Sequence, residues 1–280
     1  KYNDADKFGV NPGKTIKFHV NCDGPKKYNC QIVKMIHGDT NPRGPGPIEE
    51  NVDANCNGEH NGRPQTIYSG SYGYVEDNTH LQVESFTMQC WIWPTTPKTH
   101  PKYWRHGAQG LMAKWSNGKG YGLFINEEGC LELRINGTSI TTGAPIRDHA
   151  WSFVAATFDA STGQATLYHE PQIVYALDPE IPPVSQKVSG GIEHTAGVPF
   201  AVAAYAGGAD SSPQAQASRP AGMVIAGHYN GKIDNPRLCR RALSREEIET
   251  MKLGAQPGLT ERRHSGPTGP LSECIVGSWD

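Results

Sequence analysis

The residues best suited to chemistry are His37 and Asp39, which one glycine separates. A strand that ends at this point could present an imidazole and a carboxylate together, and such a pair can bind a metal ion. A structural explanation competes, because an Asp side chain at the start of a turn commonly accepts hydrogen bonds from backbone amides. A third explanation is an interface or polar loop cluster, in which His37, Asp39, Arg43 and Glu49 dock a neighbouring domain or subunit. For His37 and Asp39 we prefer the structural explanation over the metal site.

Other catalytic arrangements are absent from the sequence. A retaining glycosidase needs two carboxylates about 5–5.5 Å apart, and on one strand only residues two or four apart share a face. The paired glutamates at 49–50, 127–128 and 246–247 are adjacent, and Glu132 alternates with Arg134 on an edge that we expect to face solvent. The eleven histidines lack the H-x-H and H-E-x-x-H spacings of zinc sites. We therefore predict no catalytic residue and no metal ligand in this chain.

Aromatic residues raise the possibility of sugar binding. Tyr103, Trp104 and Trp115 would be able to stack on a sugar ring if their faces were exposed. Aromatic side chains are more often core or interface anchors, and this is the interpretation that we prefer.

Four residues towards the C-terminus are expected to be structural. Gly231 opens a strand that leads to Asp234, where a calcium site would lack the several carboxylates that Ca²⁺ prefers. Ser244 and Glu247 have the spacing of a capping box, in which each side chain accepts a hydrogen bond from the backbone amide of the other residue. The pattern predicts a short helix directly after Ser244.

The composition argues against two classes of partner. The net charge is −2 and no basic stripe is present, which argues against nucleic acid. The apolar runs are far shorter than the roughly 20 residues that cross a bilayer, which argues against the membrane. The seven cysteines are scattered and include no C-x-x-C pair, so we expect reduced thiols and a cytoplasmic location.

Strand signals dominate the chain. Period-two alternation predicts a strand at 15–22 and a return strand at 28–36, followed by a Pro/Gly-rich loop, and these form a small N-terminal β lobe over residues 1–62. Regularly spaced strands predict a β-sandwich, to which we assign residues 63–254. Within it, residues 176–222 are expected to be a long loop around one strand at 200–205. Residues 255–280 are interpreted as a linker and the start of a further segment.

Several of these segments carry a resemblance to a known fold. The motifs are SYGYV at 71–75, SFTMQCWIWP at 85–94, WSFVAATFD at 151–159, GKIDNPR at 231–237 and RALSREEI at 241–248. Together they resemble the strands and closing helix of laminin-G-like jelly rolls. The resemblance implies an all-β, concanavalin A-like/laminin-G-like sandwich with one short C-terminal helix.

A narrower resemblance covers nearly the whole chain. The motifs IVKMIHGD at 32–39, NPRGPG at 41–46, AGHYNGKID at 226–234 and IVGSWD at 275–280 resemble the N-terminal region of the N,N-dimethylformamidase large subunit. That family hydrolyses small formamides to an amine and formate. The resemblance implies a mononuclear iron bound by a downstream catalytic domain, with no cofactor in this segment, and it implies a small subunit and a homo-oligomer as partners.

Two functions remain open at this stage. The first is a non-catalytic scaffold and assembly domain of an iron-dependent amide hydrolase, which the resemblance implies. The alternative is an independent carbohydrate-binding, lectin-like module, which the sandwich fold would permit. Neither function uses a catalytic group of this chain.

Overall fold

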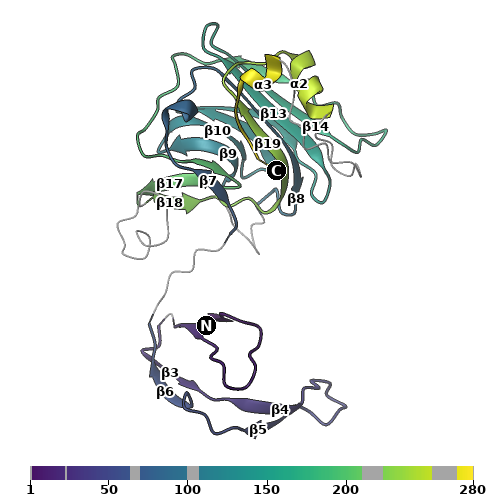
Figure 1. The fold of residues 1–280 in the computed structure, drawn as a ribbon. Helices are drawn as coiled ribbons and strands as arrows, with labels where there is room; N and C mark the ends of the chain where they lie inside the picture. Colours follow the sequence, from purple (N-terminus) through teal and green to yellow (C-terminus); the bar gives the residue numbers. More distant parts are fainter. Residues whose placement is uncertain are drawn as a thin grey trace. The chain divides into compact units, whose positions relative to one another are not determined.

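The computed structural model describes residues 2–22, 24–63, 70–99, 107–209, 223–253 and 270–279. The chain divides into two compact units, Lys1–Ser69 and Gly70–Asp280, and both are built mainly of β-strands (Figure 1). Within the described residues no helix is long and apolar enough to cross a membrane.

The first unit consists of three two-stranded antiparallel ribbons. They are β1 (Tyr2–Ala5) with β2 (Phe18–Asn21), β3 (Lys27–Cys30) with β6 (Gly58–Asn61), and β4 (Val33–His37) with β5 (Ile48–Asn51). The Pro/Gly-rich loop lies between β4 and β5, at the position where the sequence predicted a loop. The predicted pairing of the strands at 15–22 and 28–36 is wrong, because β2 pairs with β1 and the second segment is divided between β3 and β4.

Very little of the first unit is buried. Among its described side chains only Cys22 is fully buried, while large apolar side chains such as Phe8, Phe18 and Met35 are more than half exposed. An isolated two-stranded ribbon is at best marginally stable in water. Backbone hydrogen bonds rather than an apolar interior therefore hold this unit together.

The second unit is a sandwich of two six-stranded antiparallel sheets. The first sheet has the order β12 (Thr138–Pro145), β11 (Cys130–Ile135), β10 (Lys119–Ile125), β9 (Gln109–Ser116), β16 (Phe200–Val202) and β7 (Gly73–Val75). The second sheet has the order β15 (Val184–Lys187), β14 (Gln164–Pro171), β13 (Ser152–Asp159), β8 (Phe86–Pro94), β19 (Gly231–Cys239) and β20 (Ile275–Ser278). The predicted all-β jelly roll is confirmed.

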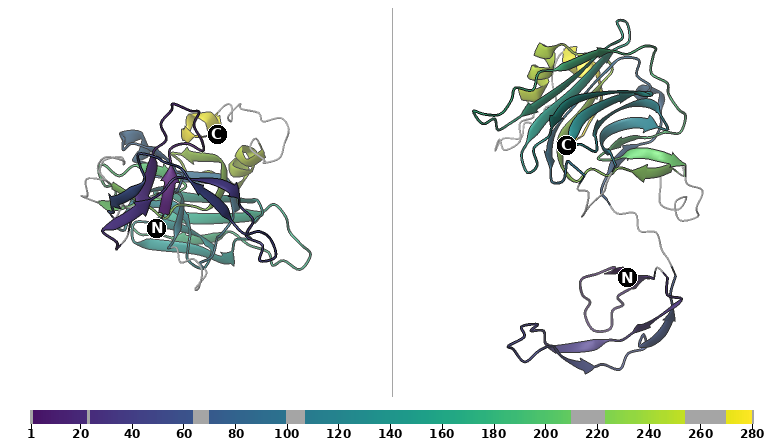
Figure 2. Two further views of the ribbon diagram at one scale, coloured as in Figure 1. Left: turned by 90° about the horizontal axis from the view of Figure 1, so that it is seen from below. Right: turned by 180° about the vertical axis from the view of Figure 1, so that it is seen from behind.

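The remaining elements flank the sandwich. They are the hairpin of β17 (Tyr205–Ala209) and β18 (Met223–Ala226), the 3-10 turn η1 (Thr79–Leu81), and the helices α2 (Arg245–Leu253) and α3 (Pro270–Glu273). The two helices and the β17–β18 hairpin lie on opposite sides of the sandwich (Figure 2). The predicted helix after Ser244 is α2.

Alternating side chains fill the space between the two sheets. Phe86, Met88 and Ile92 of β8 are fully buried in the same cluster as Tyr121 and Leu123 of β10. Burial of this apolar surface contributes about 25 cal/mol for each Å² that leaves water. The intervening residues of β8 are also covered, because a second cluster joins Trp91 and Phe153 to Ile248 and Met251 of α2.

Several stretches of the second unit differ from the sequence interpretation. Strands β12, β15 and β18 were not predicted. The expected strand at 200–205 is divided, since Ala203 has a φ of 65° and turns the chain from β16 into the β17–β18 hairpin. The tail expected to be a linker contributes β20, which pairs with β19 at the edge of the second sheet, and the Trp279 ring stacks on Phe200 at 5.4 Å.

Candidate functional site

The predicted polar cluster lies on the β4–β5 ribbon and its connecting loop. His37 ends β4 opposite Ile48, and the backbone amide of Asp39 donates to Nδ1 of His37 at 3.3 Å. Oδ1 of Asp39 accepts from the amide of Asn41 at 2.8 Å, and Oδ1 of Asn41 accepts from the amide of Arg43 at 3.0 Å. Two side chains thus bond backbone two residues ahead, which is the turn chemistry preferred from the sequence.

The same ribbon exposes apolar side chains beside these polar residues. Met35, Ile36 and Ile48 are 55%, 46% and 45% exposed, and exposed Glu49 lies opposite Met35 in the ladder. We define the ribbon surface as the three apolar residues together with His37, Asp39, Arg43 and Glu49. Exposed apolar residues within a charged surround are typical of surfaces that contact another polypeptide.

Gly231, at the start of the closing segment, has a clear physical reason. A Cβ atom on Gly231 would lie 2.5 Å from the carbonyl oxygen of Trp93 and 2.5 Å from Oη of Tyr229, so only glycine fits at the start of β19. Asp234 is half-buried opposite Trp91, next to the irregularity at which Asn235 adopts a φ of 50°.

The capping box at α2 is present as predicted. The amide of Ser244 donates to Glu247 Oε2 at 2.8 Å, and the amide of Glu247 donates to the Ser244 hydroxyl at 3.3 Å. Arg241 adds two hydrogen bonds of 2.9 Å to the Glu247 carboxylate. The hydrogen bonds from Arg241 and from the Ser244 amide lower the pKa of Glu247.

A polar hollow of about 380 Å³ lies at the first sheet, between β11 and the β17–β18 hairpin. Its charged and polar lining comprises Asn126, Glu127, Glu128, Glu132, Arg134 and Tyr205. The sequence did not predict this grouping, because two of the glutamates belong to a turn and the third to the following strand. The expectation that Glu132 lies on a solvent-facing edge was wrong. Glu132 is only 7% exposed, and β11 is an interior strand of the sheet.

Two of the groups in this hollow, Glu132 and Arg134, are paired with each other. Glu132 accepts a hydrogen bond from Nη2 of Arg134 at 2.8 Å through one oxygen and contacts the Ser139 hydroxyl through the other. The Arg134 guanidinium lies over the rings of Phe124 at 4.4 Å and Trp115 at 5.3 Å. The Trp115 face is therefore covered, and both Glu132 oxygens have partners. Tyr103 and Trp104, the other aromatic candidates, lie outside the described residues.

A metal centre is not apparent in the part of the chain that the structure describes. There, no group of three or more His, Cys, Asp and Glu side chains is arranged to hold an ion. His37 and Asp39 therefore have no third ligand of these types within the described ribbon.

The two packed antiparallel sheets define a concanavalin A-like/laminin-G-like jelly roll. Consistent with this, residues 69–170 match the family model Laminin_G_3, described as the concanavalin A-like lectin/glucanases superfamily. Among solved structures, a putative carbohydrate binding protein from Bacteroides ovatus is similar with a TM-score of 0.47 and 14% identity, covering 83% of this chain and 58% of that one. A heptameric pentraxin from Limulus polyphemus has a TM-score of 0.38 and 14% identity, covering 60% and 70%.

More specific similarity comes from two curated relatives. The chain is 34% identical over 270 residues to the N,N-dimethylformamidase beta subunit of Paracoccus aminophilus, covering 89% of this chain and 32% of the relative. It is 26% identical to the beta subunit of the same name from Alcaligenes sp., covering 89% and 33%. The chain thus spans about a third of the length of these relatives. The large-subunit designation from the sequence was wrong, because both relatives are named beta subunit.

Proposed function

We propose that this chain is a non-catalytic assembly segment of an N,N-dimethylformamidase-like amide hydrolase. The observation that carries the proposal is the 34% identity over 89% of the chain with a dimethylformamidase beta subunit. The parent enzyme would use water to cleave the C–N bond of a small N-substituted formamide, giving an amine and formate. Its mononuclear iron would be bound by residues outside this chain. We place the enzyme in the cytoplasm.

The two units would have different roles in this enzyme. The jelly roll, with its continuous apolar core, is a rigid platform. The first unit has almost no interior of its own, so its exposed apolar residues gain most from contact with another polypeptide. We assign the ribbon surface to a contact with a partner subunit, because the relatives are named as subunits. The downstream catalytic domain and further copies of the chain complete the assembly.

Activity assays test the catalytic part of the proposal. The purified chain and the complete hydrolase are incubated with dimethylformamide, and released dimethylamine and bound iron are measured. We expect turnover and iron only in the complete enzyme. Amide hydrolysis by the chain alone, at a rate comparable with that of the enzyme, would refute a non-catalytic role.

Substitution on the ribbon tests the assembly part. Met35→Asp with Ile48→Asp in the complete hydrolase places two charges in the proposed contact, and subunit association is followed by analytical ultracentrifugation. We expect the dissociation constant to rise at least about tenfold. Val10→Asp is the matched control, because Val10 is also an exposed apolar residue but lies outside the ribbon surface. Equal association of both variants would contradict the assignment.

Sugar binding is the competing function, and a glycan array with and without Ca²⁺ distinguishes it. We expect no saturable binding, because Arg134 covers the Trp115 ring and Glu132 is already paired. Specific glycan binding that Glu132→Gln abolishes would replace the assembly proposal with a lectin-like one.

A further inference from the structure

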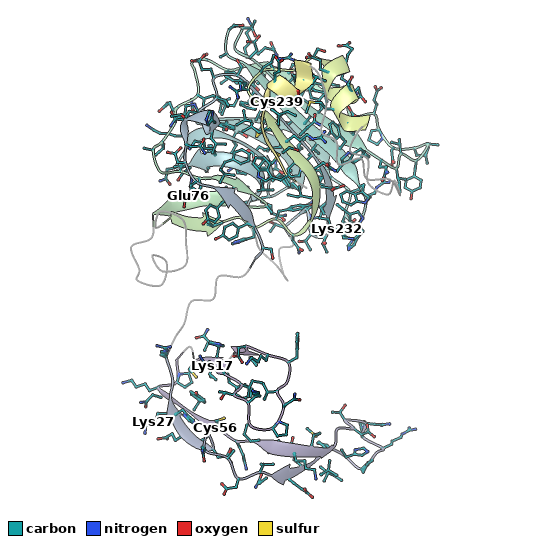
Figure 3. All side chains as sticks on the ribbon, viewed as in Figure 1. Lys17, Lys27, Cys56, Glu76, Lys232 and Cys239 are labelled. Atoms are coloured by element: carbon teal, nitrogen blue, oxygen red, sulfur yellow. The ribbon has the colours of Figure 1, made fainter. Side chains whose placement is uncertain are left out.

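Two of the cysteines lie together at the junction of two ribbons in the first unit. Cys30 is the last residue of β3, and Cys56 lies in the turn just before β6. In the ladder Cys30 is opposite Gly58, which places Cys56 beside the point where the β3–β6 ribbon leads into the β4–β5 ribbon. The Cys56 thiol is close enough to Cys30 to contribute to the raised pKa of the Cys30 thiol. Figure 3 labels Cys56 at this point of the lobe.

The backbone around Cys56 is held in place by several hydrogen bonds. Its carbonyl oxygen lies 2.7 Å from Nε2 of His60, whose ring stacks on Tyr28 of β3 at 5.4 Å. The next residue, Asn57, accepts from the amide of Ile32 at 2.8 Å and donates to the carbonyl of Val52 at 2.8 Å. The turn is thereby fixed to both ribbons. Two fixed chain segments thus bring two thiols close together, as a disulfide requires, since it tolerates Cα separations only up to about 7 Å.

We propose that Cys30 and Cys56 form a reversible disulfide that locks the base of the β4–β5 ribbon. Both side chains are partly exposed, so a small disulfide such as oxidised glutathione can reach them. A second pair of neighbouring cysteines, Cys239 and Cys274, is 1% and 6% exposed and provides an internal comparison. Because oxidised glutathione cannot reach these two buried thiols, Cys239 and Cys274 should stay reduced.

The reaction is a thiol–disulfide exchange in two steps. Burial, together with the neighbouring Cys56, raises the pKa of Cys30, so Cys56 is expected to attack first. The Cys56 thiolate displaces one glutathione from oxidised glutathione and forms a mixed disulfide. The Cys30 thiolate then attacks the Cys56 sulfur and releases the second glutathione. Two protein thiols are oxidised, one glutathione disulfide is reduced to two thiols, and the two protons pass to the released glutathione.

The lock matters because the first unit lacks an apolar core. A cross-link between residues 30 and 56 reduces the conformational freedom of the first unit when that unit is locally unfolded. It adds no contacts to the folded unit. Local opening, and hence proteolysis within residues 31–55, should slow by on the order of a hundredfold.

The test uses the full chain with equal concentrations of reduced and oxidised glutathione. After alkylation of free thiols under denaturing conditions, peptide mass spectrometry should find Cys30 linked to Cys56, while Cys239 and Cys274 are alkylated. Limited proteolysis of the lobe should slow in wild type and in Cys239→Ser/Cys274→Ser, but not in Cys30→Ser or Cys56→Ser. Persistence of free Cys30 and Cys56 thiols, a stable glutathione adduct without cross-link, or earlier oxidation of the Cys239–Cys274 pair would overturn the proposal. None of these readouts depends on amide hydrolysis.

Discussion

Replacing His169 should change how the stability of the jelly roll depends on pH. His169 lies on β14 and is 2% exposed, and neither ring nitrogen has a hydrogen-bond partner among the described residues. Burial lowers the pKa of His169 from 6.5 to about 4, although the neighbouring Glu170 opposes this shift. The folded protein therefore holds a neutral imidazole at a pH where an unfolded chain already binds a proton.

The size and sign of the effect follow from these two pKa values. Between pH 6.5 and about 4 the unfolded state binds more protons at this site, so the free energy of unfolding decreases as the pH falls. The contribution of His169 to stability is complete above pH 6.5 and is lost towards the folded-state pKa. Between pH 7 and pH 5 the loss amounts to about 2 kcal/mol.

Urea denaturation of wild type and His169→Leu at pH 7 and pH 5 measures this effect. All six tryptophans lie after residue 70, so their fluorescence reports on the jelly roll. Relative to wild type, the variant should gain about 2 kcal/mol on acidification, because leucine does not titrate. His80→Gln, which removes an exposed histidine, should follow wild type. Parallel pH profiles for wild type and His169→Leu would refute the reasoning.

Three further substitutions have predictable costs. Asp77→Asn should lower the free energy of unfolding in urea by about 3–5 kcal/mol. The side chain of Lys114 is 1% exposed, and the substitution removes the carboxylate that lies 2.6 Å from its amine. An equal cost of Asp77→Asn in a protein that already carries Lys114→Met would contradict this. Gly120→Ala should cost about 2–3 kcal/mol in the same assay, because its φ is 103° and the added Cβ would lie 2.0 Å from the Lys114 carbonyl oxygen. Gly137→Ala, with open space around it, is the control and should stay within about 0.5 kcal/mol. Ser244→Ala should lower the free energy of unfolding by about 1 kcal/mol through loss of the α2 cap, and an unchanged thermal midpoint would count against that cap.

The jelly roll was predictable because its central strands carry strong local patterns. In β8 every second residue is apolar, and the residues between them include two tryptophans, which indicates cover on both faces. The helix α2 was predictable for a similar reason, since its cap is encoded within four residues. In both cases the information lies within one short stretch of chain.

Pairing and burial in other places depend on residues that are distant in sequence. Alternation in β2 indicates a strand but does not identify β1 as its partner. Strand β12 has small polar residues and a glycine, so its side chains carry little signal, although its backbone completes the first sheet. The burial of Glu132 follows from its interior strand, and the polar hollow requires the turn at 127–128 to meet β17. The proximity of Cys30 and Cys56 likewise becomes apparent only once β3 and β6 are paired.

The contribution of β20 has a practical consequence for anyone who shortens this protein. Because Trp279 stacks on Phe200 and its amide donates to the carbonyl of Pro236 at 3.1 Å, the last described residues close one end of the sandwich. A version that stops after α2 would uncover an aromatic ring and expose the hydrogen-bonding edge of β19 to other chains. Such a truncation is expected to aggregate during expression, whereas one that retains residues up to 279 should remain monodisperse.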